Sequence, residues 1–249
     1  MKYGYCFIGV CPVRKEPSHK SEQVTQLLFG DFVEVLQDMG EWVEIRNLSD
    51  SYLGYIDSRN IILTSEIQEY KFYSTVPLSY ISTDTHYPTP IPFGAKIIDL
   101  NYNIGKHSFK VENSELTPVN CLKKSDLHSL ISKFINVPYL WGGKSIMGID
   151  CSGLMQVVYS VLNINLPRDA SEQYKIGTEI LSLESAKDGD LCFFGKDKEH
   201  ISHVGMYFSD NKIIHSSGRV REDCIDNKGI KPLDKEGYSH ILQGIRRIS

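Results

Sequence analysis

The stretch "GIDCSGLMQVVY", residues 148–159, places one cysteine where an apolar helical pattern begins. Asp150 can cap the N-terminus of that helix, so Cys151 would lie in its first turn. There the unpaired backbone amides and the helix dipole favour a thiolate and can stabilise an oxyanion. Cys151 also aligns with the apolar stripe, where it would be a small buried hydrophobe, so two interpretations stay open. The stripe consists of Leu154, Val157, Val158, Val161 and Leu162.

A nucleophilic thiol needs a proton acceptor, and "HVGMYFSDNKIIHSSG", which starts at His203, offers two candidates. Two strand-like runs flank residues 209–211. If these form a three-residue loop with Asn211 left-handed, Gly205 pairs with His215, and His203 and His215 share one face. His203 would then act as the base, and His215 would orient it. The opposite, buried face is predicted to hold Val204, Met206, Phe208 and Ile213.

The same segment admits a metal site as the rival interpretation. His200 and His203 could be combined with Cys192 or His215. However, the chain has no tight Cys/His pair at zinc-like spacing. We therefore expect neither a metal nor a cofactor.

The composition narrows the class of protein. The 249 residues carry a net charge of −4 without a basic cluster, so we exclude nucleic-acid binding. No apolar stretch reaches the length of a membrane span. The first residues do not resemble a signal peptide, which predicts a cytoplasmic protein, or an exported one if such a signal has been removed. The six cysteines include no CxxC pair and are predicted to be reduced thiols, as in a cytosolic protein.

The chain divides by pattern into a β-rich half and an α+β half. Residues 1–120 contain short alternating runs, and "FGDFVEVL" from Phe29 is echoed by "FGAKIIDL" from Phe93. This echo predicts two small barrels, 1–64 and 65–120, the second weakened by three prolines. Residues 121–249 begin with a predicted helix that is capped by Ser125 or Asp126 and ended by Pro138, and the Cys151 helix follows it. Four strand-like runs come after these two helices, so an α+β domain is predicted.

Four ordered blocks of the second half resemble the NlpC-type cell-wall cysteine peptidases. They are "PYLWGGKSIMGIDCSGL", "LPRDASEQ", "KDGDLCFF" and "HVGMYFSDNKIIHSSG", within Leu122–Ser249. The resemblance implies a papain-like fold with a Cys–His–His triad at Cys151, His203 and His215. It also implies that Tyr139 lies near the oxyanion.

The resemblance further assigns residues to the substrate groove. Trp141 would form a wall of the groove, although core packing explains it equally well. Asp150 and Ser152 would line the substrate pocket, although Asp150 can equally serve as the helix cap.

The first half resembles a bacterial SH3-like barrel over "VRKEP...SEQVTQLLFGDFVEVLQDMGEWVEIRNLSDSYLGYI". Barrels before such a peptidase resemble the γ-D-glutamyl-L-diamino acid endopeptidases of dipeptidyl-peptidase VI type. These release L-Ala-γ-D-Glu from murein peptides whose L-Ala amine is free. By this resemblance the first barrel partly closes the groove and limits its length. Tyr55, or alternatively Tyr52, contributes there, although both tyrosines could equally belong to the barrel core.

A free amine calls for a carboxylate in a closed pocket, and Asp169 matches the amine-binding aspartate of these enzymes. Alternatively, or at the same time, Asp169 and Glu172 form a capping box. Arg168 would pair with Asp169, reach the D-Glu carboxylate, or form a surface ion pair.

Together these patterns predict a monomeric cysteine peptidase that hydrolyses the γ-D-Glu–diamino acid bond of murein peptides. Two alternatives stay open. One is an inactive module that binds murein peptide, and the other is a thiol amidase or acyltransferase with another substrate.

Overall fold

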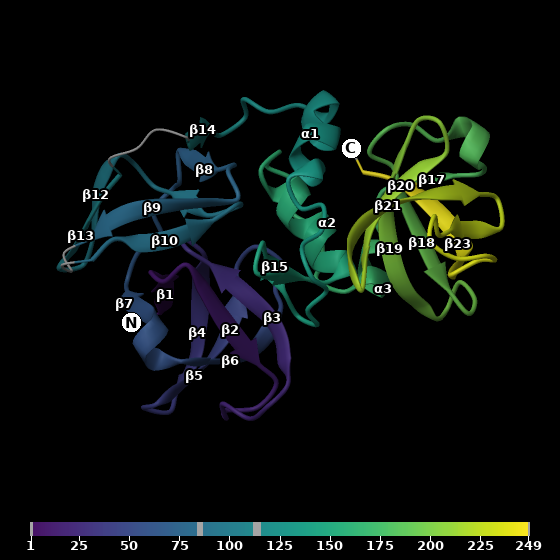
Figure 1. Cartoon of the computed structure of the whole chain (residues 1–249). Helices are drawn as coiled ribbons and strands as arrows, with labels where there is room; N and C mark the ends of the chain where they lie inside the picture. Colours follow the sequence, from purple (N-terminus) through teal and green to yellow (C-terminus); the bar gives the residue numbers. More distant parts are fainter. Residues whose placement is uncertain (1, 84–86, 112–115, 249) are drawn as a thin grey trace.

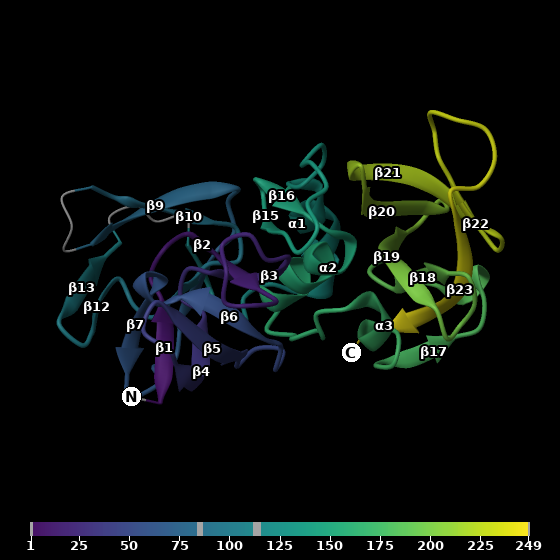
Figure 2. The same cartoon turned by 90° about the horizontal axis from the view of Figure 1, so that it is seen from below.

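The computed structural model describes residues 2–83, 87–111 and 116–248. Two β-rich parts flank a central group of helices (Figure 1). The N-terminal strands and the C-terminal sheet lie on opposite sides of α1 and α2, and the view from below shows the same order (Figure 2). Among the described residues, no helix is both long enough and apolar enough to cross a lipid bilayer.

The first part is a barrel of seven antiparallel strands in the order β3-β2-β6-β5-β4-β1-β7. Alternating side chains along these strands enclose a core that includes Cys6, Cys11 and Ile45. The strands are β1 Tyr3–Cys6, β2 Val10–Arg14, β3 Gln23–Leu28, β4 Phe32–Asp38, β5 Trp42–Asn47, β6 Leu53–Asp57 and β7 Ile61–Thr64, with the 3₁₀ turn η1 Ser58–Asn60 before β7.

The second part consists of two small antiparallel sheets, in the orders β10-β9-β13-β12 and β11-β8-β14. The predicted boundaries at residues 64/65 and 120/121 fall between β7 and β8 and after β14. A second SH3-like barrel over residues 65–120 stays a prediction. The strands are β8 Phe72–Ser74, β9 Leu78–Thr83, β10 Thr89–Pro92, β11 Lys96–Ile97, β12 Asn101–Ile104, β13 His107–Lys110 and β14 Leu116–Pro118.

The two echoed sequence segments form the same kind of turn. Each places a buried phenylalanine before a glycine with positive φ, 88° at Gly30 and 87° at Gly94. Each turn is closed by a backbone hydrogen bond from the residue after the glycine, of 3.0 Å in the first and 3.2 Å in the second. Glycine suits this position because a side chain there would be strained. The turns also meet, because the amide of Lys96 donates to the Phe29 carbonyl at 2.9 Å.

The C-terminal part combines three short helices with a seven-stranded antiparallel sheet in the order β17-β23-β18-β19-β20-β21-β22. The helical elements are η2 Lys124–Asp126, α1 Leu127–Ser132, α2 Cys151–Ser160, α3 Ala170–Gln173 and η3 Leu183–Ser185. The strands are β15 Lys144–Ser145, β16 Gly148–Ile149, β17 Thr178–Ile180, β18 Leu191–Gly195, β19 Ile201–Phe208, β20 Lys212–Ser217, β21 Arg219–Asp226, β22 Gly229–Lys231 and β23 His240–Arg247.

Helix α1 is shorter than its apolar pattern predicts. It ends at Ser132, well before Pro138, and a left-handed residue at Asn136 (φ 69°) redirects the chain. Asp126 occupies the N-cap position, but its carboxylate accepts from the Lys123 amide at 2.8 Å and does not cap α1. The preceding 3₁₀ turn competes for the same side chain.

The C-terminal sheet curls because β23 pairs with β18 on one side and with β22 on the other. Its outer face packs against α1 and α2 through Val204, Met206 and Phe208, as predicted. Ile213 was assigned to this face wrongly. It lies opposite Tyr207 in the ladder and therefore points into the enclosed core, and Ile214 takes its place against the helices.

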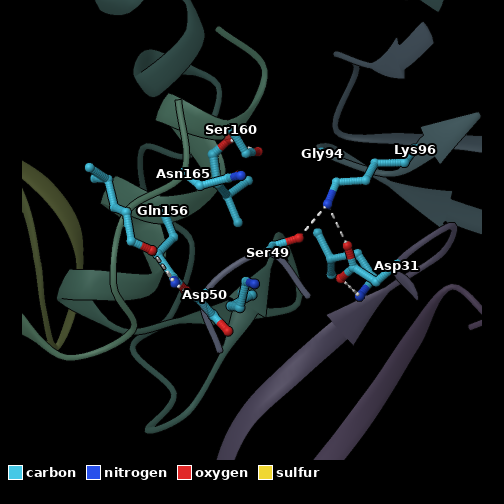
Figure 3. A pocket seen from close by; sticks show the side chains of 12 residues that line it. Asp31, Ser49, Asp50, Gly94, Lys96, Gln156, Ser160 and Asn165 are labelled. Carbon is cyan, nitrogen blue, oxygen red and sulfur yellow. Dashed lines mark hydrogen bonds and ion pairs between the residues drawn. The ribbon is translucent and has the colours of Figure 1, made fainter. Parts of the chain in front are cut away.

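A small polar cavity of about 30 Å³ lies where the three parts meet (Figure 3). Lys96 is buried there and lies 2.9 Å from Asp31, while it donates to Ser49 at 2.7 Å. From helix α2, Gln156 donates to Asp50 of the first barrel at 2.9 Å. These contacts fix the first barrel against the helix that carries Cys151.

Candidate active site

Helix α2 begins at Cys151, as predicted, and Asp150 is its N-cap. One Asp150 oxygen accepts from the Gly153 amide at 2.7 Å, and the other accepts from the Gly142 amide at 2.8 Å. Both oxygens also contact the Arg168 guanidinium. Because its acceptors are occupied within the protein, Asp150 holds the start of the helix in place.

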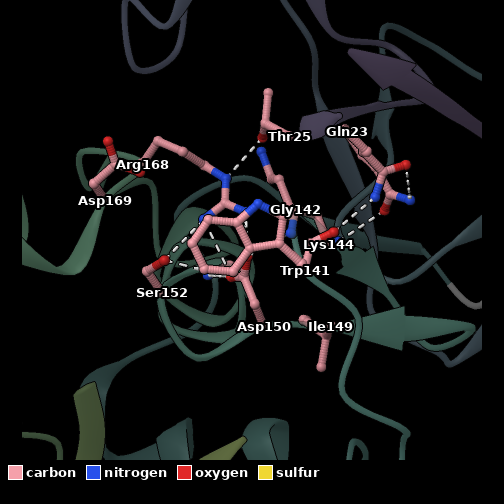
Figure 4. Close-up of polar contacts among 12 residues, drawn as sticks. Gln23, Thr25, Trp141, Gly142, Lys144, Ile149, Asp150, Ser152, Arg168 and Asp169 are labelled. Carbon is pink, nitrogen blue, oxygen red and sulfur yellow. Dashed lines mark hydrogen bonds and ion pairs between the residues drawn. The ribbon is translucent and has the colours of Figure 1, made fainter. Parts of the chain in front are cut away.

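Arg168 is buried and links the first barrel to this helix start (Figure 4). Its Nε donates to Thr25 Oγ1 on β3 at 2.8 Å, and one terminal nitrogen donates to Ser152 Oγ at 2.8 Å. A surface ion pair was the wrong expectation, and so was pairing with Asp169. A buried guanidinium needs several acceptors at once, and Asp150, Ser152 and Thr25 supply them.

The hairpin between β19 and β20 has the predicted register. Gly205 pairs with His215, and the three-residue turn contains left-handed Asp210 and Asn211. His203 and His215 therefore share a face, and His203 Nε2 lies 2.9 Å from His215 Nδ1. Gly205 leaves room for the neighbouring strand, because a Cβ there would lie 2.7 Å from Ile213 Cδ1 and 3.0 Å from the Cβ of His215.

A bulge positions the residues just before His203. Phe194 of β18 pairs with His203, but Gly195 pairs with Ile201, so Ser202 is the extra residue. Bulges of this kind re-aim side chains beside functional sites. Here Ile201 and Ser202 line the same cleft as Cys151.

The surroundings of Cys151 favour a thiol, whereas the helix start alone predicts a thiolate. Burial, and then the Asp150 carboxylate, raise the pKa of Cys151 to about 11. Hydrogen bonds from the Val204 and Ser152 amides lower it only partly. Burial and the neighbouring His215 and His240 hold the pKa of His203 well below its usual value. His203 is therefore neutral, which is the state that a base requires.

Two further residues extend the histidine pair, and sequence reasoning missed both. His215 Nε2 lies 3.0 Å from Asp223 Oδ2 on β21, and the His240 ring stacks on His203 with centroids 4.1 Å apart. A hairpin turn at Gly218 could have predicted the position of Asp223. Such a turn pairs His215 with Arg221, which puts Asp223 on the same face of the sheet as His215. His240 comes from a distant strand and carries no such signal.

The metal alternative finds little geometric support. His200 is exposed and binds Asp197, and Cys192 points into the enclosed core. Within the described ranges, His203, His215 and His240 bring ligand nitrogens within 4.8 Å of one another. However, His203 Nε2 and His215 Nδ1 are hydrogen-bonded to each other. These two nitrogens are therefore not free to bind a metal in this arrangement.

Cys151 opens onto a cleft of about 840 Å³ between the first barrel and the C-terminal part. Tyr139 lines this cleft, and burial, followed by Cys151 and Asp150, raises its pKa to about 12, so its hydroxyl stays a hydrogen-bond donor. Trp141 also lines it and is 61% exposed, which rules out core packing. Its indole donates to Glu22 of the first barrel at 2.8 Å.

Tyr52, and not Tyr55, is the barrel tyrosine that reaches the cleft. Tyr55 lies on β6 opposite Glu44, whereas Tyr52 lies in the loop before that strand. The Tyr52 hydroxyl lies 3.4 Å from both Asp169 oxygens. The predicted capping box is wrong, because the Asp169 side chain makes no cap hydrogen bond, and Glu172 pairs with Lys175.

Comparison with known proteins matches two families along the chain. The NlpC/P60 family matches residues 136–246, and the bacterial dipeptidyl-peptidase SH3 domain matches residues 13–61. The gamma-D-glutamyl-L-lysine dipeptidyl-peptidase of Bacillus subtilis is 33% identical over 217 residues, which cover 77% of this chain and 71% of that protein. The chain belongs to the NlpC/P60 family.

Other NlpC/P60 relatives extend the match over more of the chain. The gamma-D-glutamyl-L-lysine dipeptidyl-peptidase of Bacillus cereus is 29% identical and covers 90% of this chain and 74% of that protein. The crystal structure of an NlpC/P60 family protein from Bacillus cereus has a TM-score of 0.81 at 21% identity, covering 98% of this chain and 99% of that one. The predicted family and fold class are confirmed, and the roles of individual site residues stay predictions.

Proposed function

We propose that this protein is a cysteine peptidase that hydrolyses the γ-D-Glu–diamino acid bond of murein peptides with a free N-terminal L-Ala. It would release L-Ala-γ-D-Glu. The observation that carries this proposal is the contact between Tyr52 and Asp169 in the Cys151 cleft. This contact supports the proposal because Asp169 and a residue of the first barrel line the same cleft.

This carboxylate suits an ammonium group. Asp169 is half-buried, and burial raises its pKa although Arg168 and Tyr52 oppose that effect. A cation beside Asp169 would offset the desolvation of the carboxylate and form a charge-assisted hydrogen bond. The gamma-D-glutamyl-L-lysine dipeptidyl-peptidases named above support a substrate of the same class.

The chemistry would follow from the groups around Cys151. The Cys151 thiol passes its proton to His203 as sulfur attacks the γ-carbonyl, and the tetrahedral oxyanion accepts hydrogen bonds from helix-start amides and the Tyr139 hydroxyl. His203 then protonates the leaving amine of the diamino acid, which leaves an acyl-enzyme. Water attacks the thioester carbonyl while His203 takes its proton, and the tetrahedral intermediate then breaks its C–S bond. The departing Cys151 sulfur takes the proton back from His203, and the dipeptide leaves with a new γ-carboxyl group.

The test compares L-Ala-γ-D-Glu-diaminopimelate with the same peptide acetylated on the L-Ala amine, with products identified by mass spectrometry. We expect cleavage of the free peptide and a loss on acetylation on the order of 10²-fold, since a carboxylate left unpaired in the pocket is costly. Equal cleavage of both would refute the free-amine specificity. Cleavage of neither would refute the peptidase proposal.

Variants separate the two groups at the amine site. Asp169→Asn should abolish the preference for the free amine, while the acetylated peptide is cleaved at the unchanged slow rate. Tyr52→Phe removes only the hydroxyl and should raise KM about tenfold or less for the free peptide. Tyr55→Phe is the matched control, because Tyr55 does not line the cleft. This variant should leave kcat and KM unchanged.

A further inference from the structure

Asp223 is a buried carboxylate at the far end of the histidine pair. It lies on β21, diagonal to His215, and its Oδ2 is 3.0 Å from His215 Nε2. None of the catalytic steps described above uses it directly. Its surroundings nevertheless constrain the protons on both histidines.

Asp223 is ionised, and every contact it makes comes from a donor. Arg221 donates from one terminal nitrogen to Oδ1 at 2.8 Å, and its Nε lies 2.8 Å from Oδ2. The Leu233 amide donates to Oδ1 at 2.9 Å. Burial works to raise the pKa of Asp223, but the hydrogen bonds from His215, Leu233 and Arg221 hold it below its usual value.

An ionised carboxylate can only accept hydrogen bonds, so His215 must carry a proton on Nε2. In the neutral imidazole, His215 Nδ1 is then an acceptor. The 2.9 Å contact between His215 Nδ1 and His203 Nε2 therefore requires the proton on His203 Nε2. This leaves the lone pair of His203 on Nδ1.

We propose that Asp223 is a positioning residue that sets the tautomers of both His215 and His203 and so prepares His203 Nδ1 as the base for Cys151. This inference rests on the proposed peptidase function. Its direct consequence, the state of two imidazole rings, can be measured without a substrate. Arg221 contributes by keeping Asp223 ionised, and Arg221 is itself anchored by Asp234 at 2.8 Å.

The first test reads the tautomers in the wild-type protein. Two-bond ¹H–¹⁵N correlation spectra of histidine-labelled protein distinguish Nδ1–H from Nε2–H rings. We expect both His203 and His215 as Nε2–H tautomers at neutral pH. A Nδ1–H tautomer at either ring would overturn the proposal, whatever substrate the enzyme takes.

The second test is Asp223→Asn. An asparagine side chain has one acceptor oxygen and one donor NH₂ group, so it cannot replace both carboxylate oxygens as acceptors. If the NH₂ group faces His215, both histidine tautomers are reversed. If it faces the other way, it meets the donors of Leu233 and Arg221. We expect kcat to fall by on the order of 10²–10⁴-fold with KM nearly unchanged, as for a base held in the wrong tautomer. Asp226→Asn is the matched control on the same strand, since Asp226 pairs with Lys231. An unchanged kcat in Asp223→Asn would contradict the proposal.

A double-mutant cycle separates this role from a merely structural one. In a His215→Ala background, Asp223→Asn should change the residual kcat by about twofold or less, because its effect passes through His215. An equal loss in both backgrounds would refute the proposal. If Asp223→Asn does not fold, the wild-type tautomers still decide the question.

Discussion

The hydroxyl of Thr25 should stabilise the junction between the first barrel and the start of helix α2. Thr25 is 1% exposed on β3, and its Oγ1 accepts from Arg168 Nε at 2.8 Å. Thr25→Val keeps the shape but leaves a buried guanidinium N–H without an acceptor. A hydrogen bond to a charged group contributes about 1.5–3 kcal/mol, so we expect a loss of that size.

Thr25→Ser is the matched control. It keeps the hydroxyl and deletes one buried methyl group, which should cost about 0.8 kcal/mol. The other end of Arg168 holds Asp150 and Ser152, which lie beside Cys151, so Thr25→Val should also lower kcat/KM about tenfold. This is less than the ~10²-fold cost of displacing a reacting group by 1 Å, because Arg168 keeps its other contacts. Thr25→Ser should keep most of the activity.

The assay uses Trp141, which lies at this junction, as a fluorescent reporter in urea unfolding. The chain has two tryptophans, so Trp42→Phe leaves Trp141 alone. In an Arg168→Met background the further loss from Thr25→Val should shrink to about 0.5 kcal/mol or less. The reasoning fails if Thr25→Val destabilises the protein no more than Thr25→Ser does.

Three further predictions concern the cleft. Trp141→Phe removes the hydrogen bond to Glu22 and should raise KM a few-fold at nearly constant kcat; an unchanged KM in steady-state assays would contradict this. In His203→Gln, iodoacetamide labelling of Cys151, followed by mass spectrometry, should keep rising above pH 9, because burial raises the pKa of that thiol to about 11. A labelling plateau below pH 8 in that variant would oppose this. His240→Phe keeps a ring over His203 but removes a group that lowers the pKa of His203, so the acid limb of the kcat/KM profile should move to higher pH; a shift to lower pH would refute it.

Local sequence patterns were enough to predict the elements that carry Cys151 and the two histidines. The spacing of apolar residues after Cys151 predicted α2, and Asp150 as its cap is what the structure shows. The odd-length turn before Lys212 predicted the pairing of Gly205 with His215. These features depend on neighbours close in sequence, so the sequence contains the information needed to predict them.

Contacts between distant segments were not predictable in the same way. Arg168 pairs with Asp150 and reaches Thr25, 143 residues away, and nothing in the local sequence of either residue indicates this. The assignment of Tyr55 to the groove failed for a similar reason. The position of the loop before β6 against Asp169 depends on how the barrel docks.

The protonation of Cys151 shows most clearly where sequence reasoning ends. A cysteine in the first turn of a helix favours a thiolate when only the helix is considered. Burial, which arises from packing, outweighs that effect together with the carboxylate of the neighbouring Asp150. By itself the sequence determined the helix that begins at Cys151 and the histidine hairpin, because short-range periodicity and turn chemistry encode them. Its motif blocks carried the resemblance to the family. Only the tertiary structure decided the partners of Arg168, the barrel tyrosine that reaches the cleft and the raised pKa of Cys151, because desolvation and long-range hydrogen bonds exist only in the folded chain.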